Sequence, residues 1–189
     1  MNYCSDCGSN ELNWSIPEGD NRPRHVCSSC NTIFYQNPKI VAGCIAEWED
    51  TVLLCKRAIE PRHGYWTLPA GFMENAETTL EAAVRETLEE ANARVDNVDL
   101  YTVLNIPHTN QVYMMFRAKL ADLEFSPGEE SLECGLYKEH EIPWDELAFP
   151  TISHTLKFYF EDRKRGQYSV RCGDIVRQDN RAVFLERRN

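Results

Sequence analysis

The chain has 189 residues, a formal net charge of −10 and eight cysteines. This length suits one ordinary domain with a sizeable core plus a small appendage. The acidic balance disfavours nucleic acid as a partner, because sequence-independent binding to a polyanion needs a basic surface. No apolar run approaches the roughly 18–20 residues of a membrane span, and the N-terminus lacks the charged-then-apolar pattern of a secretion signal. We therefore expect no membrane partner and a cytoplasmic location, or an organelle such as the chloroplast for a mature chain.

Four of the cysteines form two close pairs near the N-terminus. Nineteen residues separate Cys4-x2-Cys7 from Cys27-x2-Cys30, a spacing typical of a tetrahedral zinc site built from two tight turns. A segment this short has no hydrophobic core of its own, so the metal would supply most of its folding free energy. Four thiolates close the coordination shell, which makes such a zinc structural. Two disulfides or unligated thiols are the alternatives to this zinc ribbon, which we predict at residues 1–35.

The Asn37-Pro38 pair ends this first segment, because the residue before a proline avoids helical backbone angles. It opens a second predicted domain, residues 36–165. Two apolar runs joined by a polar turn follow, at 39–48 and 52–58, and both predict buried strands.

Basic side chains at the end of the second run are candidates for binding substrate phosphates. An enzyme this acidic that acts on phosphates must recruit a metal or local arginines at its site. Two arginines are candidates for binding phosphates: Arg57, in the second apolar run, and Arg62, in the loop 59–70 that follows it. Ordinary exposure to solvent is an equal alternative for both.

Residues 78–91 have the period of an amphipathic helix. Thr78, followed three residues later by Glu81, predicts a capping box at its start. Asn92 tolerates the left-handed conformation that ends many helices. Apolar positions recur at i, i+3, i+4, i+7, i+8 and i+11 and predict a core-facing stripe made of Leu80, Ala83, Val84, Thr87, Leu88 and Ala91.

Three carboxylates crowd onto about one quadrant of the same helix. Glu86, Glu89 and Glu90 are at i, i+3 and i+4, where like charges destabilise a helix by a few tenths of a kcal/mol per pair. Arg85 supplies one cation among them, and Glu77 adds a fourth carboxylate before the helix. Oxygen ligands clustered in this way suit Mg2+ or Mn2+, which bind through a few carboxylates plus substrate phosphates. A solvated acidic face is the alternative.

These residues fit a longer pattern, G-x5-E-x7-R-E-x-x-E-E, which runs from Gly71 to Glu90. The pattern resembles the Nudix box, the signature of hydrolases of nucleoside diphosphates linked to another moiety. Two positions depart from it: Asn92 stands where the family usually has glycine, and Ala93 where it has a bulky aliphatic residue. Neither departure touches a carboxylate, so the resemblance implies a pyrophosphohydrolase. It also implies an α/β fold, a Nudix-type α/β/α sandwich with a mixed sheet, which agrees with the pattern of strands and helices.

The resemblance assigns roles within the box. Glu86, Glu89 and Glu90 would ligate Mg2+ (or Mn2+), with Glu90 the strongest candidate for an inner-sphere ligand. Arg85 would orient a ligand carboxylate, and Gly71 would let its loop approach the metal and the phosphates.

The general base would be a box glutamate or a carboxylate from a distant loop. Glu130, with its neighbour Glu129, is the distant candidate, in a polar turn at 125–131 that we expect to be flexible. Ordinary solvated turn residues are the alternative, because loop tips are normally polar.

The remaining segments predict a hairpin, a strand and a second amphipathic helix, followed by a tail without an assigned role. The helix is expected at 151–165, stopped by Gly166, with an inward face made of Ile152, Leu156, Tyr159 and Phe160. The tail, residues 166–189, contains two weak strand patterns. The other predicted segments are the hairpin strands 100–106 and 112–120, the strand 132–138 and the tail strands 167–172 and 182–186.

The resemblance also narrows the substrate. A four-cysteine ribbon before a Nudix domain is similar to the NADH pyrophosphatases, but the SQPWPFPxS-like run that marks them is missing after the box. The stretches 16–27, 33–44, 54–71 and 144–149 look more like the ADP-ribose/FAD pyrophosphatase branch. We therefore expect Mg2+-dependent hydrolysis of an ADP-linked small molecule, FAD or ADP-ribose, to AMP and a phosphorylated product.

Several alternatives remain open. The enzyme could act on NADH or nucleotide sugars instead, or the chain could be a non-catalytic sensor of ADP-ribose, although a sensor would usually have lost metal glutamates. A nucleic-acid binder acting on capped RNA would need a basic groove. Many relatives in this family are dimers, which leaves a homodimer open beside a monomer.

Overall fold

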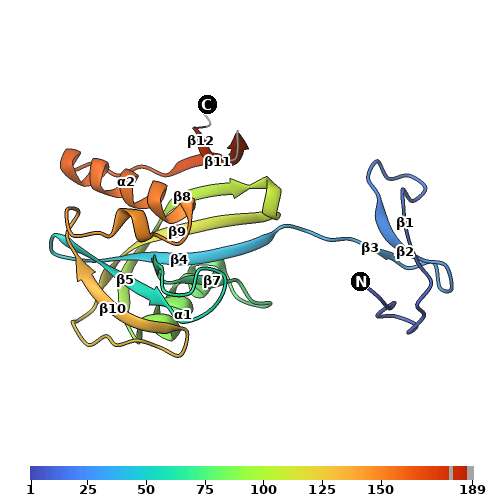
Figure 1. The fold of residues 1–189 in the computed structure, drawn as a ribbon, viewed down its shortest axis with the longest axis horizontal. Coiled ribbons are helices and arrows are strands. Elements are labelled where there is room, and N and C mark those ends of the chain that lie inside the picture. The colour runs from blue at the N-terminus through green and yellow to red at the C-terminus, as the bar shows by residue number, and fades with distance from the viewer. Residues whose placement is uncertain (179–180, 187–189) are drawn as a thin grey trace. The chain divides into compact units, whose positions relative to one another are not determined.

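The computed structural model describes residues 1–178 and 181–186 of the chain. The backbone divides into two compact units, residues 1–37 and residues 38–189, whose elements are labelled in Figure 1. In the part of the chain that the structure describes, no helix is long and apolar enough to cross a membrane.

The first unit is a small antiparallel sheet with the strand order β1-β2-β3. Its strands are β1 (Leu12–Ser15), β2 (Arg24–Cys27) and β3 (Ile33–Phe34). Cys4 and Cys27 are the only two buried residues in this unit, all of which the structure describes. The unit therefore has no apolar core that would hold it together without its cysteines.

The second unit is built on one mixed sheet of nine strands. The main path runs β10-β5-β4-β9-β8-β11-β12, with β6 paired to β5 and β7 paired to β4. The β4–β9 and β8–β11 pairs are parallel and the others antiparallel. The strands are β4 (Lys39–Trp48), β5 (Thr51–Arg57), β6 (Trp66–Thr67), β7 (Ala70–Phe72), β8 (Val95–Ile106), β9 (Gln111–Leu120), β10 (Ser131–Tyr137), β11 (Arg171–Gln178) and β12 (Arg181–Glu186).

The helices begin and end where their sequences predict. Thr78 and Glu81 form the capping box, and Asn92 ends the first helix with a φ of 47°. Gly166 ends the second with a φ of 66°. The helices are α1 (Thr79–Ala91) and α2 (Pro150–Arg165), with the short 3-10 turns η1 (Pro107–Thr109) and η2 (Trp144–Glu146).

The two helices cover opposite faces of the sheet, as the alternation along β4 shows. Val41 and Ile45 belong to a large cluster with residues of α2, whereas Ala42, Cys44 and Ala46 pack with residues of α1. Successive side chains of a strand point to opposite faces, so one strand serves both cores. The predicted α/β/α sandwich is thereby confirmed (Figure 1).

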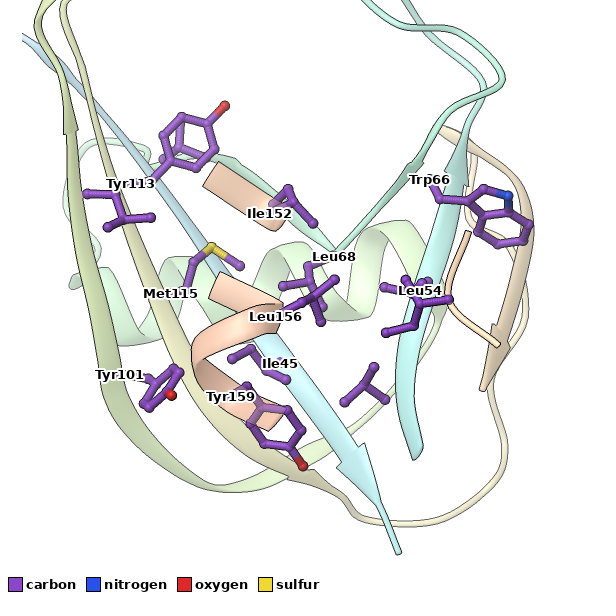
Figure 2. Packing of buried hydrophobic residues seen from close by; sticks show 14 of the residues in the cluster. Ile45, Leu54, Trp66, Leu68, Tyr101, Tyr113, Met115, Ile152, Leu156 and Tyr159 are labelled. Carbon is purple, nitrogen blue, oxygen red and sulfur yellow. The ribbon is translucent and has the colours of Figure 1, made fainter. Parts of the chain in front are cut away.

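The larger core lies between the sheet and α2. Figure 2 shows Ile152, Leu156 and Tyr159 of α2 packed over Ile45 of β4 and Met115 of β9. All five are fully buried, which confirms the inward face predicted for this helix.

The predicted apolar stripe of α1 is wrong in part. Leu80 and Leu88 are 41% and 49% exposed, whereas Glu86 and Glu90 are buried. The α1 face of the sheet carries small side chains such as Ala42 and Cys44, and the helix meets it through alanines of its own. Leucines would hold the helix further from the sheet, so they lie outside, and the two glutamates turn inward instead.

The C-terminal tail belongs to the sheet of the second unit. The strand predicted at 167–172 is shifted: β11 begins at Arg171 and runs parallel to β8, while β12 pairs with β11. Asp162 of α2 accepts hydrogen bonds from Arg171 and from the Tyr101 hydroxyl, the latter at 2.8 Å. This buried ion pair joins the tail to α2.

Candidate active site

Arg85 is the centre of a hydrogen-bonded network at the start of the predicted site. Its Nη2 donates to Glu77 Oε1 at 2.7 Å and to the carbonyl oxygen of Phe72 at 3.1 Å. Its Nη1 donates to Glu86 Oε1 at 2.8 Å and to Glu89 Oε2 at 3.0 Å. One guanidinium therefore fixes the loop before α1 and two of the three box glutamates.

Glu77 is held as an anion by this network. The hydrogen bonds from Arg85, together with the backbone N–H of Glu74, lower the pKa of Glu77 to about 2. Its charge therefore stays in place across the physiological pH range, and it fixes the loop rather than exchanging protons.

Glu86 and Glu90 have the opposite electrostatic character. Burial raises the pKa of Glu90 to about 8, although the Ala70 N–H donates to its Oε2 at 3.2 Å. Burial also raises the pKa of Glu86, against the hydrogen bond from Arg85. Both carboxylates repel each other and Glu130. This corner of the protein carries more carboxylate than its own cations neutralise.

Gly71 lies where its loop comes close to α1. A Cβ at this position would overlap the carboxylate of Glu86. The glycine thus lets β7 lie directly against the acidic side of the helix, as the family resemblance implies.

The turn at 125–131, expected to be flexible, is tied to the end of α1. The backbone N–H of Gly128 donates to the Glu90 carbonyl oxygen at 2.9 Å, and that of Ser126 donates to the Ala91 carbonyl oxygen at 2.9 Å. The Asn92 side chain also donates to the carbonyl oxygens of residues 126 and 127, both at 3.2 Å. These bonds place Glu129 and Glu130 at the mouth of the same site.

A cleft of about 1250 Å³ opens at these carboxylates. It exceeds the roughly 300–1,000 Å³ of a typical small-molecule site. The predicted site residues that border it, Gly71, Arg85, Glu86, Glu89, Glu90, Glu129, Glu130, Arg57 and Arg62, come from β5, β7, α1 and two loops.

The two predicted phosphate-binding arginines differ in how they are held. Arg57 donates to the Pro61 carbonyl oxygen at 3.0 Å, and its guanidinium lies 5.2 Å from the centre of the Phe149 ring. Arg62 lies in an exposed loop, over the ring of Tyr65. Arg57 also acts electrostatically on Glu90, so it is the better placed of the two.

Apolar side chains also border the cleft, and the sequence did not point to them. Ile106, Tyr113, Phe149 and Ile175 border it, together with the hydroxyl-bearing Thr151. These residues come from β8, β9, β11, α2 and the N-cap of α2. Figure 2 shows Tyr113 of β9 and Ile152 of α2 at the same end of the core. No local motif marks these residues, because their proximity arises only when distant segments meet.

The four cysteines of the first unit form the most compact metal-ligand set. Their sulfur atoms all lie within 4.8 Å of one another, the only such group in the described ranges 1–178 and 181–186. The N–H of Gly8 donates to Cys4 and that of Asn31 to Cys27, so each Cys-x2-Cys turn is closed by the same backbone bond. This geometry fits a tetrahedral ion.

The box glutamates fit a different kind of ion. Their oxygen atoms do not form a closed cage, because Arg85 lies between Glu86 and Glu89. Mg2+ keeps several waters and takes only one or two carboxylates plus substrate oxygens. Buried, partly uncompensated carboxylates at a cleft suit that mode of binding.

Comparison with known proteins agrees with this geometry. A model of the Nudix N-terminal zinc ribbon matches residues 2–36, and a model of the NUDIX domain matches residues 37–165. The NAD-capped RNA hydrolase NudC of Photorhabdus laumondii is 30% identical over 145 residues, which cover 75% of this chain and 53% of that protein. The NudC of Salmonella schwarzengrund is 28% identical over 150 residues. The chain therefore spans about half the length of these curated relatives.

Solved structures give the same family. A NUDIX hydrolase from Nitrosomonas europaea is 58% identical and superposes with a TM-score of 0.89, covering 93% of this chain and 99% of that one. An ADP-ribose pyrophosphatase from Streptococcus suis, 22% identical with a TM-score of 0.56, covers 72% of this chain and 99% of that one and shares the fold. The chain belongs to the Nudix hydrolase family, with the family's N-terminal zinc ribbon in front of its Nudix domain.

Proposed function

We propose that this protein hydrolyses the pyrophosphate bond of an ADP-linked small molecule, with release of AMP and a phosphorylated product. The observation that carries the proposal is the joining of two surfaces in one cleft. The same cleft is bordered by the crowded carboxylates with Arg85 and by apolar side chains. A pyrophosphate linked to a nucleoside matches a cleft of this mixed character.

The chain's own residues orient the reacting groups. Glu86, Glu89 and Glu90 would hold a divalent ion, and Arg85, fixed by Glu77, keeps Glu86 and Glu89 in place. Such an ion would supply Lewis-acid chemistry to the phosphoryl group and to an attacking water. Arg57, at the end of β5, supplies positive charge to the substrate phosphates. Gly71 lets β7 and the segment that follows it approach these phosphates.

Glu130 is the proposed general base. The hydrogen bonds that tie its turn to α1 hold it beside Glu86 and Glu90, at the edge of the cleft. An exposed carboxylate in this position can accept a proton from an attacking water and return it to solvent.

ADP-ribose and FAD are the substrates we favour, because the chain is acidic and its cleft takes a dinucleotide-sized molecule. The names of the curated relatives favour a second candidate, NAD or NAD-capped RNA. These relatives are about twice as long as the aligned region, so their substrate transfers to this chain only as a proposal. Such a substrate would bring in the nucleic-acid partner that the net charge disfavours.

The test is hydrolysis of the pyrophosphate bond with Mg2+ or with a chelator, measured as AMP release from ADP-ribose, FAD, NADH and an ADP-sugar and as release of nicotinamide mononucleotide from NAD-capped RNA. We expect Mg2+-dependent hydrolysis of ADP-ribose or FAD at a rate above that of the capped RNA. Faster turnover of NAD-capped RNA would establish the second candidate. No turnover of any substrate, with tight binding of ADP-ribose, would make the protein a sensor.

The first unit is proposed to hold one structural Zn2+. Cys27→Ser should remove the ion and unfold residues 1–37, while the second unit keeps its melting transition, since residues 1–37 and 38–189 are two compact units and only the first contains the cysteine site. Zinc content and thermal unfolding measure both effects, and an unchanged zinc content would reject the site. Analytical ultracentrifugation decides between a monomer and a homodimer.

A further inference from the structure

Two cysteines of the second unit face each other across neighbouring strands. Cys55 of β5 and Cys134 of β10 are direct partners in the antiparallel pairing, and their sulfur atoms lie 3.2 Å apart. Both are free thiols. Residues directly opposite in such a pair have Cα atoms about 4.5–5.5 Å apart, inside the roughly 4.4–6.8 Å found across disulfides. A disulfide between these cysteines therefore requires no change in strand pairing.

The two thiols differ in their access to solvent. Cys134 is partly exposed, whereas Cys55 is fully buried in a small apolar cluster that includes Ala91 of α1. An oxidant dissolved in water therefore reaches the sulfur of Cys134 first and finds Cys55 beside it. An accessible cysteine next to a second cysteine that can complete a disulfide is the usual arrangement of a redox-sensitive pair.

The pair lies against the end of the helix that carries the box glutamates. The Cys134 thiol donates a weak hydrogen bond to the carbonyl oxygen of Glu90, over 3.7 Å. Glu90 is in the last turn of α1, where carbonyl oxygens have no partner within the helix. The same oxygen accepts the N–H of Gly128 at 2.9 Å. The backbone of a predicted metal ligand is therefore held both by the turn at 125–131 and by β10.

The two strands also lead directly into the site. Arg57 follows Cys55 by two residues on β5 and pairs with Ser131, the first residue of β10. Glu130, the proposed base, immediately precedes Ser131. The pairing register shifts within the first three residues of β10, and a bulge of this kind interrupts the hydrogen bonds of a strand locally. A displacement of β10 is therefore passed on to the segment that carries Glu130.

We propose that Cys55 and Cys134 form a redox switch of the catalytic cleft. Oxidation by a hydroperoxide joins them in a disulfide, which weakens metal binding and lowers turnover until a dithiol reduces it. The inference rests on the proposed function, because the regulated step is the metal-dependent hydrolysis.

The chemistry balances with hydrogen peroxide as the oxidant. The Cys134 sulfur attacks one peroxide oxygen, the O–O bond breaks, and a sulfenic acid and one water form. The Cys55 sulfur then attacks the Cys134 sulfur, the S–S bond forms, and the departing hydroxide takes the Cys55 proton and leaves as a second water. The two thiols together lose two electrons and two protons. A dithiol reverses the step by thiol–disulfide exchange and becomes a disulfide itself.

Oxidation changes two features next to the metal ligands. The sulfur atoms must close from 3.2 Å to about 2.05 Å, a movement of about 1 Å. Cys134 also loses the proton that it donates to the Glu90 carbonyl oxygen. A misplacement of about 1 Å can cost a catalytic arrangement roughly 100-fold in rate. Because the carboxylates receive only part of this movement, we expect an effect of about 10-fold.

The test treats the full-length protein with hydrogen peroxide and removes the oxidant before the measurements. Peptide mapping by mass spectrometry without reduction identifies the disulfide, and electron paramagnetic resonance measures the affinity for Mn2+. Turnover is measured with Mg2+ on the substrate that the reduced protein hydrolyses. We expect a peptide that links Cys55 to Cys134, about 10-fold weaker Mn2+ binding and about 10-fold slower turnover. Dithiothreitol should reverse all three changes.

Cys134→Ser is the most informative variant. Its hydroxyl can still donate to the Glu90 carbonyl oxygen, but it forms no disulfide, so Mn2+ affinity should stay within about two-fold of the wild type before and after peroxide. Cys55→Ala is a second variant without the disulfide and should also keep its Mn2+ affinity in peroxide. Cys172→Ser removes an exposed thiol of β11 and is the matched control, which should respond as the wild type does.

The four cysteines of the first unit are a separate target of peroxide. Zinc release, followed with a chromogenic chelator, should be the same in the wild type, Cys134→Ser and Cys172→Ser. A difference in Mn2+ affinity between these proteins therefore reports on the Cys55–Cys134 pair alone.

The outcomes separate the switch from the proposed function. Absence of the Cys55–Cys134 peptide from the oxidised wild type would overturn the switch, and so would a disulfide that leaves Mn2+ affinity unchanged. An equal loss of Mn2+ affinity in Cys134→Ser would assign the effect to other thiols and also overturn it. A disulfide that weakens Mn2+ binding in a protein that hydrolyses no substrate would support the switch and reject the hydrolase.

Discussion

The buried carboxyl groups of the two helices, Asp162 in α2 and Glu86 and Glu90 in α1, contrast in how their charge is balanced. In α2, Asp162 accepts hydrogen bonds from Arg171 and Tyr101. Burial alone would raise the pKa of Asp162, but these bonds outweigh it and hold the pKa below its ordinary value. In α1, burial raises the pKa of both Glu86 and Glu90.

The contrast distinguishes a carboxylate that stabilises the fold from carboxylates kept for a ligand. Asp162 has its own arginine, and the pair links α2 to the tail. Two of the three box glutamates, Glu86 and Glu89, share Arg85 with Glu77, so this one cation does not balance the group of carboxylates. Strongly shifted pKa values at a cleft are typical of functional sites, and the excess charge here calls for a cation.

The largest expected effect comes from removing the most deeply buried of the predicted metal-ligand carboxyl groups, Glu90. Glu90→Gln should lower Mg2+-dependent turnover about 10³-fold, because the ion's transition-state stabilisation is worth several kcal/mol. The metal-free variant should be as stable as the wild type or more stable, since a buried, poorly compensated carboxylate is gone. Steady-state kinetics and urea unfolding in a chelator measure both. Glu133→Gln, at an exposed position of β10, is the control; wild-type turnover of Glu90→Gln would remove the contrast.

The matching change in the balanced cluster should do the reverse. Asp162→Asn leaves the Arg171 guanidinium mostly buried without a counter-charge and should cost about 3 kcal/mol of unfolding free energy. Turnover by the folded variant should stay near the wild-type value. Urea unfolding and kinetics at saturating substrate test this pair of outcomes, with Glu161→Gln, an exposed neighbour, as the control. A large loss of turnover at unchanged stability would show that this cluster is functional.

The stability difference between the wild type and Asp162→Asn should depend on pH. The folded-state pKa of Asp162 lies below the ordinary value of 3.8. Its stabilisation is therefore fully present above about pH 4 and is lost as the pH falls through the lower folded-state value. Urea unfolding from pH 7 to pH 2.5 should show the two proteins converging at the acid end. A constant difference would mean that the ion pair is not its source.

The smallest expected effect concerns the residue that fixes the shared cation. Glu77→Gln removes the anion that holds Arg85 and should raise the Mg2+ concentration for half-maximal activity about 10-fold, as for other outer-shell partners of metal ligands. The maximal rate should fall less than for Glu90→Gln. Activity measured against Mg2+ concentration tests this, and an unchanged half-saturation would show that Arg85 needs no support from Glu77.

Much of the fold could be predicted because its signals are local. The capping box of Thr78, the left-handed Asn92 and the stop at Gly166 each depend on a few neighbouring residues, and all three are present. The orientation of α1 was predicted incorrectly, because the spacing of apolar residues does not show whether the leucines or the alanines of the helix face the sheet. The small residues of β4 decide that question, and they lie far away in the chain.

The sequence by itself determined the two cysteine pairs, the strand and helix order and the box pattern that places three glutamates on one helix. These depend on spacing along a continuous backbone, which fixes neighbours by geometry alone. Tertiary structure decided which carboxylates are buried, which turn reaches the end of α1, and that Thr151, Tyr113 and Ile175 border the same cleft as the box glutamates. Such contacts join segments far apart in the chain, and only the packing of the sheet against both helices brings them together.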